Sequence, residues 1–374
     1  MQRRLTHYRV PFFEALKQAL ALQGVELTLV VGTPTPQERM KKDEGDLGWA
    51  ARVPCSYLWN GRLCWQHLAP CLARSDAVIV TQENRLLNNL PLLLGRDRYR
   101  VGLWGHGRNM QAARSTGSRL AQAAKAALSR RADWWFAYTK VSAEFVRGFD
   151  FPAERITTLN NSIDTQGLNA QVRVARQLER GFLRRQLGVD DAPLGLFVGS
   201  VYADKRIDLL VEGALRIRAR CPTFQVAVIG SGPLLEGLRR QVLAYPWFRV
   251  LGAVHGEEKS RWLACADVLL NPGLVGLGVL DAFAAEVPMV TTDCGLHSPE
   301  IAYLDHGKNG LMTAESPEAF AAGVLNVLEQ PALAARLRAG CADSARAYSL
   351  EAMVERFCSG VQGWRAAGAR PHQR

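Results

Sequence analysis

The sequence predicts an α/β protein with two domains, each built on a parallel β-sheet. With 374 residues, the chain is too long for one ordinary hydrophobic core and suits two domains. Short apolar runs alternate with helical patterns in both halves, as they do in βαβ units. The alternation pauses at residues 160–164, where we expect the link between the domains.

The first half supplies the elements of one parallel sheet. The residues before Pro11 leave little room for an initial strand ahead of the first helix. The expected strands cover 25–31, 76–81, 100–104 and 133–138, and the expected helices lie near 11–23, 61–74, 113–131 and 139–149.

The second half repeats the alternation after a polar helical stretch at 172–187. The expected strands cover 194–199, 224–229, 267–271 and 288–292, and the expected helices lie near 206–220, 232–244, 277–286, 316–328, 331–347 and 350–366. We therefore place the first domain at 1–165 and the second at 166–350, and expect a terminal helix at 351–374 to pack back on the first domain.

Composition excludes several classes of protein. A hydrophobic content of 48% with 22% charged residues is typical of a soluble globular protein, and no apolar run approaches the roughly 20 residues of a membrane span. The N-terminus lacks the apolar region of a secretory signal, so the sequence predicts a cytoplasmic location. The eight cysteines form no C-x-x-C pair, which disfavours a zinc or redox site.

The net charge of +11 is unevenly distributed. Residues 1–165 hold 23 Lys and Arg against 14 Asp and Glu, a net +9, and residues 166–374 hold 23 against 21, a net +2. A basic first domain fits peripheral docking on an anionic membrane surface, although simple solvation of the surface explains the charge equally well. No basic helix interleaved with aromatic residues indicates nucleic-acid binding.

A glycine-rich segment at 271–288 is the strongest local signal for chemistry. A strand ends at Asn271, Gly273 and the Gly276-Leu277-Gly278 run follow, and a helix begins. Glycines let backbone amides approach an anion closely, so this turn predicts a phosphate site. Asp281, about one helical turn later, is placed to accept hydrogen bonds from ribose hydroxyls, unless it is simply a solvated helix carboxylate.

Two further strand ends carry candidate groups. Lys205 and Arg206 follow the 194–199 strand at the start of a helix, where the helix dipole disfavours cations, so an anionic partner such as a diphosphate is expected, with a solvated pair as the alternative. Gly230 and Gly232 follow the 224–229 strand in a Gly-Ser-Gly-Pro turn. This turn lacks the third glycine and distant acidic residue of a dinucleotide fingerprint, which counts against a dehydrogenase.

In this order, the segments resemble glycosyltransferase family 4, whose retaining enzymes have the GT-B fold: two Rossmann-like domains with parallel sheets facing across a cleft. The resemblance covers essentially the whole chain. The matching positions are Lys205 on the family lysine, Gly230-Ser-Gly-Pro233 on Gly-x-Gly-Pro, Asp281 on the second Glu of Glu-x7-Glu, 282–288 on the stretch after it, then Pro299-Glu300 and Asn309-Gly310.

The chain departs from the family pattern at two positions. Ser200 stands where an arginine is common, so Arg206 is expected to supply that charge. Gly273 stands at the first Glu, which in the family contacts the hydroxyls of the donor sugar. The Pro-Gly-Leu-Val-Gly-Leu run looks like a variant branch among bacterial surface-polysaccharide enzymes, so we expect altered donor recognition rather than lost activity, with a dead relative as the alternative.

The first half contributes histidines to the predicted site. The family often places a histidine at a strand end facing the cleft, and His106 between two glycines fits that place, with a structural turn histidine as the alternative. His297 is a second candidate for the cleft. His7 and Arg9 lie in a first-loop region like that of polysaccharide glycosyltransferases and are expected on the acceptor side. Residues 160–164 match the interdomain segment of the family.

The resemblance implies transfer of a sugar from a UDP- or GDP-sugar to a hydroxyl of a lipid-linked glycan, with retention and without a cofactor or metal. Lys205, Arg206 and the Gly276–Gly278 turn would stabilise the departing diphosphate, and Glu300 would support the loop around the sugar. Two rival functions remain: a GT-B-shaped nucleotide-sugar epimerase, and a non-catalytic protein that binds nucleotide sugars.

Overall fold

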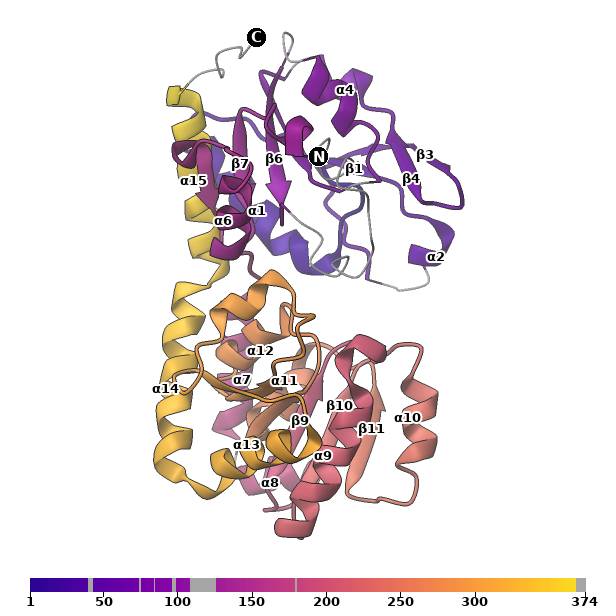
Figure 1. Ribbon diagram of the computed structural model, residues 1–374, viewed down its shortest axis with the longest axis vertical. Helices are drawn as coiled ribbons and strands as arrows, with labels where there is room; N and C mark the ends of the chain where they lie inside the picture. The colour runs from indigo at the N-terminus through magenta and orange to yellow at the C-terminus, as the bar shows by residue number, and fades with distance from the viewer. Residues whose placement is uncertain are drawn as a thin grey trace. The chain divides into compact units, whose positions relative to one another are not determined.

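The computed structural model describes residues 1–39, 43–73, 75–83, 85–95, 99–107, 126–178 and 180–367. The chain divides into two compact units, one of Met1–Ile163 with Leu350–Arg374 and one of Asp164–Ser349 (Figure 1). Each unit contains a parallel sheet. The prediction of an α/β protein with parallel sheets in two domains is confirmed.

The first unit has a four-stranded parallel sheet in the order β5-β6-β7-β8, a parallel pair β1-β2 and an antiparallel hairpin β3-β4. Its elements are η1 (His7–Arg9), α1 (Val10–Ala21), β1 (Val30–Gly32), α2 (Pro36–Arg39), β2 (Ala51–Val53), β3 (Cys55–Leu58), β4 (Leu63–Gln66), α3 (Ala69–Leu72), β5 (Ala77–Thr81), α4 (Asn89–Leu94), β6 (Arg100–Gly105), β7 (Trp134–Ala137), α6 (Lys140–Arg147), η3 (Ala153–Arg155), β8 (Ile156–Thr158) and α15 (Leu350–Ala367).

The first residues of the chain take the place of an initial strand. Gln2 forms a parallel bridge with Val31, and its amide donates to the carbonyl of Val30 at 2.8 Å. The nitrogen of Met1 donates to the carbonyl of Ile79 in β5 at 2.6 Å. The segment therefore lies between β1 and β5 and joins the two groups of parallel strands.

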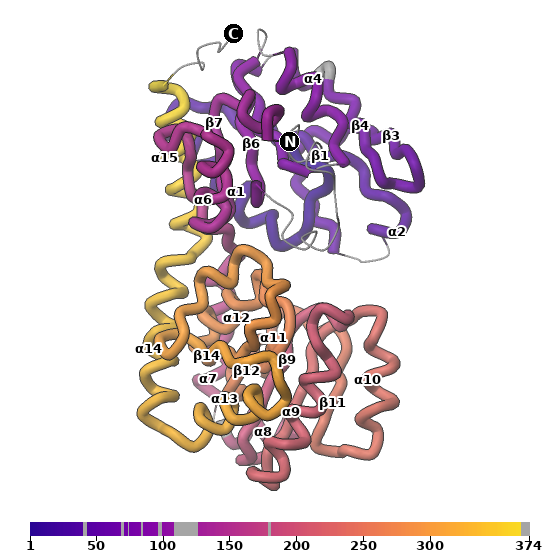
Figure 2. The backbone as a smooth tube through the Cα atoms, viewed as in Figure 1, coloured from indigo at the N-terminus to yellow at the C-terminus, as the bar shows by residue number. Residues whose placement is uncertain are grey.

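Helix α15 packs on the strands of the first unit and alongside α1 (Figure 2). Phe357 stacks on Phe136 of β7 with ring centroids 4.5 Å apart. A Cβ on Gly360 would lie 2.5 Å from Oγ1 of Thr157, so only glycine lets the helix approach the sheet this closely. The last helix of the chain is thus part of the core of the first unit.

The second unit is a six-stranded parallel sheet in the order β11-β10-β9-β12-β13-β14. Its elements are α7 (Thr165–Gln177), α8 (Arg180–Gln186), β9 (Leu194–Val198), η4 (Ala203–Lys205), α9 (Ile207–Arg220), β10 (Gln225–Ile229), α10 (Leu235–Gln241), β11 (Phe248–Gly252), α11 (Gly256–Cys265), β12 (Val268–Asn271), α12 (Gly278–Ala284), β13 (Met289–Thr292), η5 (Pro299–Tyr303), β14 (Gly310–Thr313), α13 (Pro317–Glu329) and α14 (Pro331–Ala347).

Sequence patterns explain the core of this unit. The strands are short continuous apolar runs, because helices cover both faces of a doubly wound parallel sheet. Helix α9 buries Ile207, Leu210, Ala214 and Ile217, which recur at the spacing of one helical face. Counted from β9, the strands follow the order 3-2-1-4-5-6, so the order reverses between β9 and β12.

Several expected elements differ in the structure. The expected helix at 61–74 is wrong, because β4 pairs with β3 there and only α3 is helical. The expected strand at 25–31 is reduced to β1, and the polar stretch 172–187 spans α7 and α8. The elements β2, β3, β11, α11 and β14 were not predicted. Most of the expected helix at 113–131 lies outside the described residues, and 126–129 are helical.

Candidate functional site

The carboxyl ends of the central strands of the second unit gather the residues predicted to bind the donor. β9 ends before Gly199, and β12 ends at Asn271, where the glycine-rich segment begins. The two strands are neighbours, and the strand order reverses between them. Open α/β sheets bind ligands outside the carboxyl ends of the strands at such a reversal. The fold therefore brings Lys205 and the glycine-rich segment to the place where a ligand is expected.

The glycine-rich segment packs directly against the η4 turn. A Cβ on Gly273 would lie 2.3 Å from the carbonyl oxygen of Asp204 and from the carbonyl carbon of Lys205. The amide of Leu274 donates to the carbonyl of Asp204 at 2.7 Å. A side chain at 273 would collide with this backbone. The η4 turn therefore occupies the space that a larger side chain at position 273, such as a glutamate, would need.

Lys205 is a buried cation at this edge. It is 8% exposed, and its Nζ donates to the carbonyl oxygen of Leu274 at 2.5 Å. Burial lowers the pKa of Lys205 to about 8, and the nearby Cys294 opposes this shift. The side chain is still mostly protonated at neutral pH, so its positive charge lies against the glycine-rich segment.

Arg206 faces other partners than Lys205. It adopts a left-handed conformation, with φ 51°, between η4 and α9. Its guanidinium forms an ion pair with Asp208 at 2.8 Å and another with Glu315. The two adjacent cations are therefore in different environments, and Arg206 is engaged by two carboxylates.

The Gly-Ser-Gly turn after β10 contacts the turn after β9. Gly230 and Gly232 have φ values of 152° and 159°, and a Cβ on either would lie within 2.3 Å of the carbonyl oxygen of Gly199 or Val201. Their lack of a side chain is thus explained by close packing of two backbone turns. Ser200, between those two carbonyls, is exposed.

The start of α12 presents backbone amides. Gly276, Leu277 and Gly278 are partly exposed, unlike the buried residues on either side of them. Within the described ranges, the amides of Gly276 and Leu277 donate to no backbone carbonyl, and no side chain caps the helix. These groups are free to hydrogen-bond an incoming anion.

Asp281 already has a cationic partner. It is 6% exposed, and its Oδ1 accepts a hydrogen bond from Nζ of Lys259 in α11 at 2.8 Å. Oδ2 makes no hydrogen bond within the part of the chain that the structure describes. Lys259 was not predicted as a site residue, because the sequence pattern predicted no helix over α11. Glu300 is 3% exposed and lies in η5.

In the first unit, His106 and Arg9 both contact Tyr138. His106 follows β6, and its ring lies edge-on to Tyr138 with centroids 4.1 Å apart. The guanidinium of Arg9 lies 4.7 Å from the ring of Trp104, and its Nη2 donates to the hydroxyl of Tyr138 at 3.3 Å. His7 is exposed, with Nδ1 3.3 Å from the carbonyl oxygen of Asp43. Tyr138 was not predicted as a site residue, although it directly follows the neighbouring strand β7.

His106 is neutral at physiological pH. Burial, and secondarily the charge of Arg9, lower the pKa of its imidazole to about 4. Its Nδ1 is buried and has no hydrogen-bond partner among the residues that the structure describes. A buried imidazole nitrogen without a partner is energetically costly and is suited to a ligand that supplies one.

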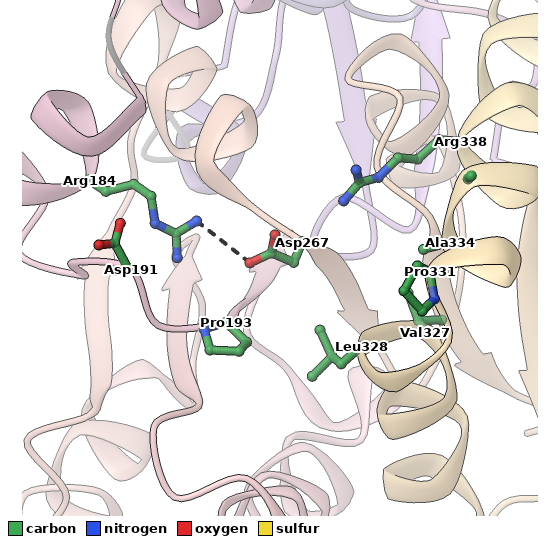
Figure 3. Close-up of a pocket in the computed structure, with 10 residues that line it drawn as sticks. Arg184, Asp191, Pro193, Asp267, Val327, Leu328, Pro331, Ala334 and Arg338 are labelled. Atoms are coloured by element: carbon green, nitrogen blue, oxygen red, sulfur yellow. Dashed lines mark ion pairs between the residues drawn. The ribbon is translucent and has the colours of Figure 1, made fainter.

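A cavity of about 510 Å³ lies elsewhere in the second unit, at the amino ends of β9 and β12 (Figure 3). Arg184 donates to the carbonyl oxygen of Cys265 at 2.8 Å and forms an ion pair with Asp267 at 3.6 Å. Arg338, on α14, lines another part of the wall. Arg184 links α8 to the residues flanking β12, at the opposite end of the sheet from the glycine turns.

The described residues contain neither a cluster of metal ligands nor a helix that could span a membrane. No group of three or more His, Cys, Asp or Glu side chains gathers there as metal ligands would. No helix there is both long and apolar enough to cross a bilayer.

Comparison with solved structures identifies the fold. The crystal structure of a glycosyltransferase from Rickettsia africae superposes with a TM-score of 0.71 at 11% identity, covering 98% of this chain and 96% of that one. Anabaena Alr3699/HepE in complex with UDP-glucose superposes with a TM-score of 0.65 at 14% identity, covering 96% and 98%. The fold is GT-B. At these identities the GT-B likeness concerns the fold alone.

Sequence comparison matches the half of this GT-B chain that contains the glycine-rich segment. Residues 192–330 match the family model described as glycosyl transferases group 1. A D-inositol 3-phosphate glycosyltransferase of Geodermatophilus obscurus is 34% identical over 193 residues, which are 47% of this chain and 42% of that protein. A protein of the same name from Nocardioides sp. is 27% identical over 244 residues, or 59% and 51%. The chain spans about half the length of these curated relatives.

Proposed function

We propose that this chain is a glycosyltransferase that moves a sugar from a nucleotide-diphosphate donor to a hydroxyl group. The observation that carries the proposal is the buried Lys205 against the glycine-rich segment, at the strand reversal of a GT-B domain. This region lies inside the segment that matches the glycosyl transferases group 1 model. UDP or GDP is the proposed nucleotide, since a UDP-sugar complex is known for a protein of the same fold.

The proposed reaction retains the anomeric configuration. The bond between the anomeric carbon and the β-phosphate oxygen breaks, and its electron pair leaves with the diphosphate. The acceptor oxygen then bonds to the same face of the anomeric carbon, and its proton passes to an oxygen of the leaving phosphate. A fixed cation and free amides stabilise charge that develops on the leaving group, which is the role we assign to Lys205 and the Gly276–Gly278 turn.

The remaining residues receive roles in binding. Oδ2 of Asp281 is proposed to accept a ribose hydroxyl, while Lys259 holds the other oxygen. Glu300 is proposed to support the loop around the sugar. Arg206 is proposed to exchange its ion pairs with Asp208 and Glu315 for the donor diphosphate when the donor binds. No cofactor or metal is part of this proposal.

On the acceptor side, we propose that Nδ1 of His106 bonds a hydroxyl of the reacting sugar or of the acceptor. Its buried position and missing partner support this assignment. Arg9 and His7, which lie in η1 just before α1, are proposed to contact the acceptor or its phosphate. The proposed acceptor is a lipid-linked glycan of a bacterial surface polysaccharide.

The β3-β4 hairpin supports peripheral docking on the membrane. Leu58, Trp59 and Trp65 are 50%, 76% and 38% exposed, and the exposed Arg62 lies between the two tryptophans in sequence. Tryptophan is enriched at membrane–water interfaces, and arginine is attracted to anionic headgroups. The hairpin belongs to the half of the chain with a net charge of 23 − 14 = +9. We propose that it contacts the anionic inner face of the plasma membrane.

Incubating the protein with UDP- and GDP-sugars, with and without glycan acceptors, tests the function. A glycosyltransferase releases nucleotide slowly from its donor without an acceptor and forms a glycoside with one. An epimerase converts the donor into a second nucleotide sugar, and a binding protein shifts the thermal midpoint without turnover. Either of the last two results would overturn the proposal.

A further inference from the structure

One peptide group of the glycine-rich segment is held at both of its polar atoms. The carbonyl oxygen of Leu274 accepts from Nζ of Lys205 at 2.5 Å. The amide that completes the same peptide group, on Val275, donates to Nδ1 of His297 at 3.0 Å. The proposed catalytic lysine and a histidine from the loop after β13 therefore hold the same peptide plane from opposite sides.

The contacts of His297 define its tautomer. Its Nε2 lies 2.8 Å from the carbonyl oxygen of Thr292, which can only accept a hydrogen bond. Nε2 must therefore carry the proton, and Nδ1 offers the lone pair that the amide of Val275 requires. His297 is 7% exposed, so water does not readily replace either partner.

Neighbouring bonds attach the segment to the loop after β13. Oγ1 of Thr292 donates to the carbonyl oxygen of Pro272 at 2.5 Å, and the amide of Ser298 donates to the carbonyl oxygen of Val275 at 2.9 Å. His297 is the titratable member of this set. Protonation of Nδ1 would place an N–H against the amide of Val275 and break that contact.

The groups around His297 favour its neutral form. Burial is the largest influence and lowers the pKa of the imidazole, and Lys205 acts in the same direction. Asp293, Glu315 and the bond to the Thr292 carbonyl oppose the shift, and the Sγ of Cys294 lies 3.7 Å from Nε2. The net direction is downward.

We propose that His297 is a positioning residue, which in its neutral form fixes the Leu274–Val275 peptide so that Lys205 and the amides of Gly276 and Leu277 face the donor diphosphate. This inference rests on the proposed function and adds a residue that acts through the backbone rather than by touching the donor. It also makes donor binding dependent on pH on the acid side. Protonation would release the peptide and reduce the affinity for the donor.

The test uses three variants of the full chain. His297→Ala removes both bonds, and His297→Asn keeps an acceptor near the position of Nδ1 without a titratable ring. His306→Ala is the matched control, because Nδ1 of His306 also accepts from a backbone amide, that of Met312 in β14, at 3.0 Å. UDP-glucose and GDP-mannose are the probes, since their diphosphates do not titrate between pH 5 and 8.

We expect His297→Ala to bind its probe at least tenfold more weakly at pH 7.5, and His306→Ala to bind like the wild type. The wild type should lose affinity as the pH falls below the ordinary histidine pKa of 6.5, because burial lowers the pKa of His297, and His297→Asn should keep most of the affinity and lose less of it on acidification. The positioning role would be overturned if His297→Ala bound its probe as tightly as the wild type. It would also be overturned if the affinity of His297→Asn fell on acidification as steeply as that of the wild type.

Hydrogen exchange separates this inference from the proposed function, because it needs no donor. In the free protein, the amide of Val275 should exchange faster in His297→Ala than in the wild type and should be unaffected in His306→Ala. If neither probe binds the wild type but exchange changes as expected, the proposed donors are wrong and the peptide contact stands. Unchanged exchange in His297→Ala refutes the contact itself.

Discussion

A Cβ placed on Gly273 would lie 2.3 Å from the carbonyl carbon of Lys205, so these residues touch backbone to backbone. We therefore expect Gly273→Ala to lower the free energy of unfolding by about 1–3 kcal/mol, because the η4 turn must move to admit a methyl group. Chemical denaturation measures this change. Gly237→Ala is the control, since a Cβ at Gly237 in α10 meets nothing within 4 Å. Equal stabilities of the two variants would contradict the packing argument.

The same contact predicts that a glutamate is not tolerated at position 273. Gly273→Glu should lose both stability and donor binding, although it introduces the carboxylate that the sequence resemblance leads us to expect there. Calorimetric titration with UDP-glucose and GDP-mannose tests this expectation. A variant that folds and binds donor more tightly would indicate that the turn adapts.

The charge of Lys205 should determine how the affinity for the donor falls at alkaline pH. Its pKa of about 8 in the free protein means that the cation is lost as the pH rises through 8, so affinity for a diphosphate should fall there. Lys205→Ala should reduce turnover by about 100- to 1000-fold, as the loss of one transition-state donor typically does. Lys205→Arg should show no alkaline limb near pH 8, because arginine stays charged.

The pH profile of nucleotide-sugar binding checks this prediction. Lys308→Ala serves as the control, because Lys308 is an exposed cation with a 3.8 Å pair to Asp305. If turnover survives in Lys205→Ala, the lysine has no part in the chemistry, and its bond to Leu274 is structural only.

The ion pair between Lys259 and Asp281 predicts non-additive effects. Lys259→Met leaves a carboxylate that is 6% exposed without its partner, so it should destabilise the protein more than Lys259→Met with Asp281→Asn together. A double-mutant cycle in urea should give a coupling of about 0.5–3 kcal/mol. Asp281→Asn alone should weaken the binding of a nucleotide sugar and of its nucleoside diphosphate equally, as expected for a contact with the ribose. Additive effects would show that the pair does not couple.

Much of this arrangement could be predicted from the sequence, and the omissions have physical causes. The strands flanking Lys205 and the glycine-rich segment are continuous apolar runs, which mark buried parallel strands without knowledge of their partners. The predicted helix at 61–74 covers β4 of the β3-β4 hairpin, and no element was predicted at β3, because these short strands form only by pairing with each other. The local sequence pattern does not reveal which segments pair with each other.

The site shows the same limit. Glycine and lysine positions follow from motif spacing, but the partners of Arg206 and Asp281, which are Glu315 and Lys259, come from distant segments. Spacing also does not distinguish a glycine that contacts a phosphate from one that contacts another turn. Gly230 is explained by the carbonyl oxygen of Gly199, a contact that only the folded chain contains.

His106 predicts a dependence of stability on pH. Its pKa is about 4 in the folded protein against an ordinary value of 6.5, so the unfolded chain binds a proton between these values that the folded chain does not. The free energy of unfolding should therefore fall as the pH falls from about 6.5 toward 4. In urea denaturation, the free energy of unfolding of His106→Gln should fall less between pH 7 and pH 5 than that of the wild type. An unchanged slope, with His306→Gln as the exposed control, would show that His106 is not the group responsible.

The β3-β4 hairpin predicts binding to anionic vesicles. Trp59→Ala and Trp65→Ala should each weaken partitioning onto phosphatidylglycerol-containing vesicles, by about 1–2 kcal/mol if each indole enters the interface. Arg62→Glu should also weaken vesicle binding, and more strongly at low salt than at high salt, because salt screens the attraction between arginine and the headgroups. Leu243→Ala is the control, since Leu243 is 85% exposed but belongs to the second unit. Co-sedimentation across a salt series measures the effect, and equal binding by all four variants and the wild type would exclude the hairpin as the contact surface.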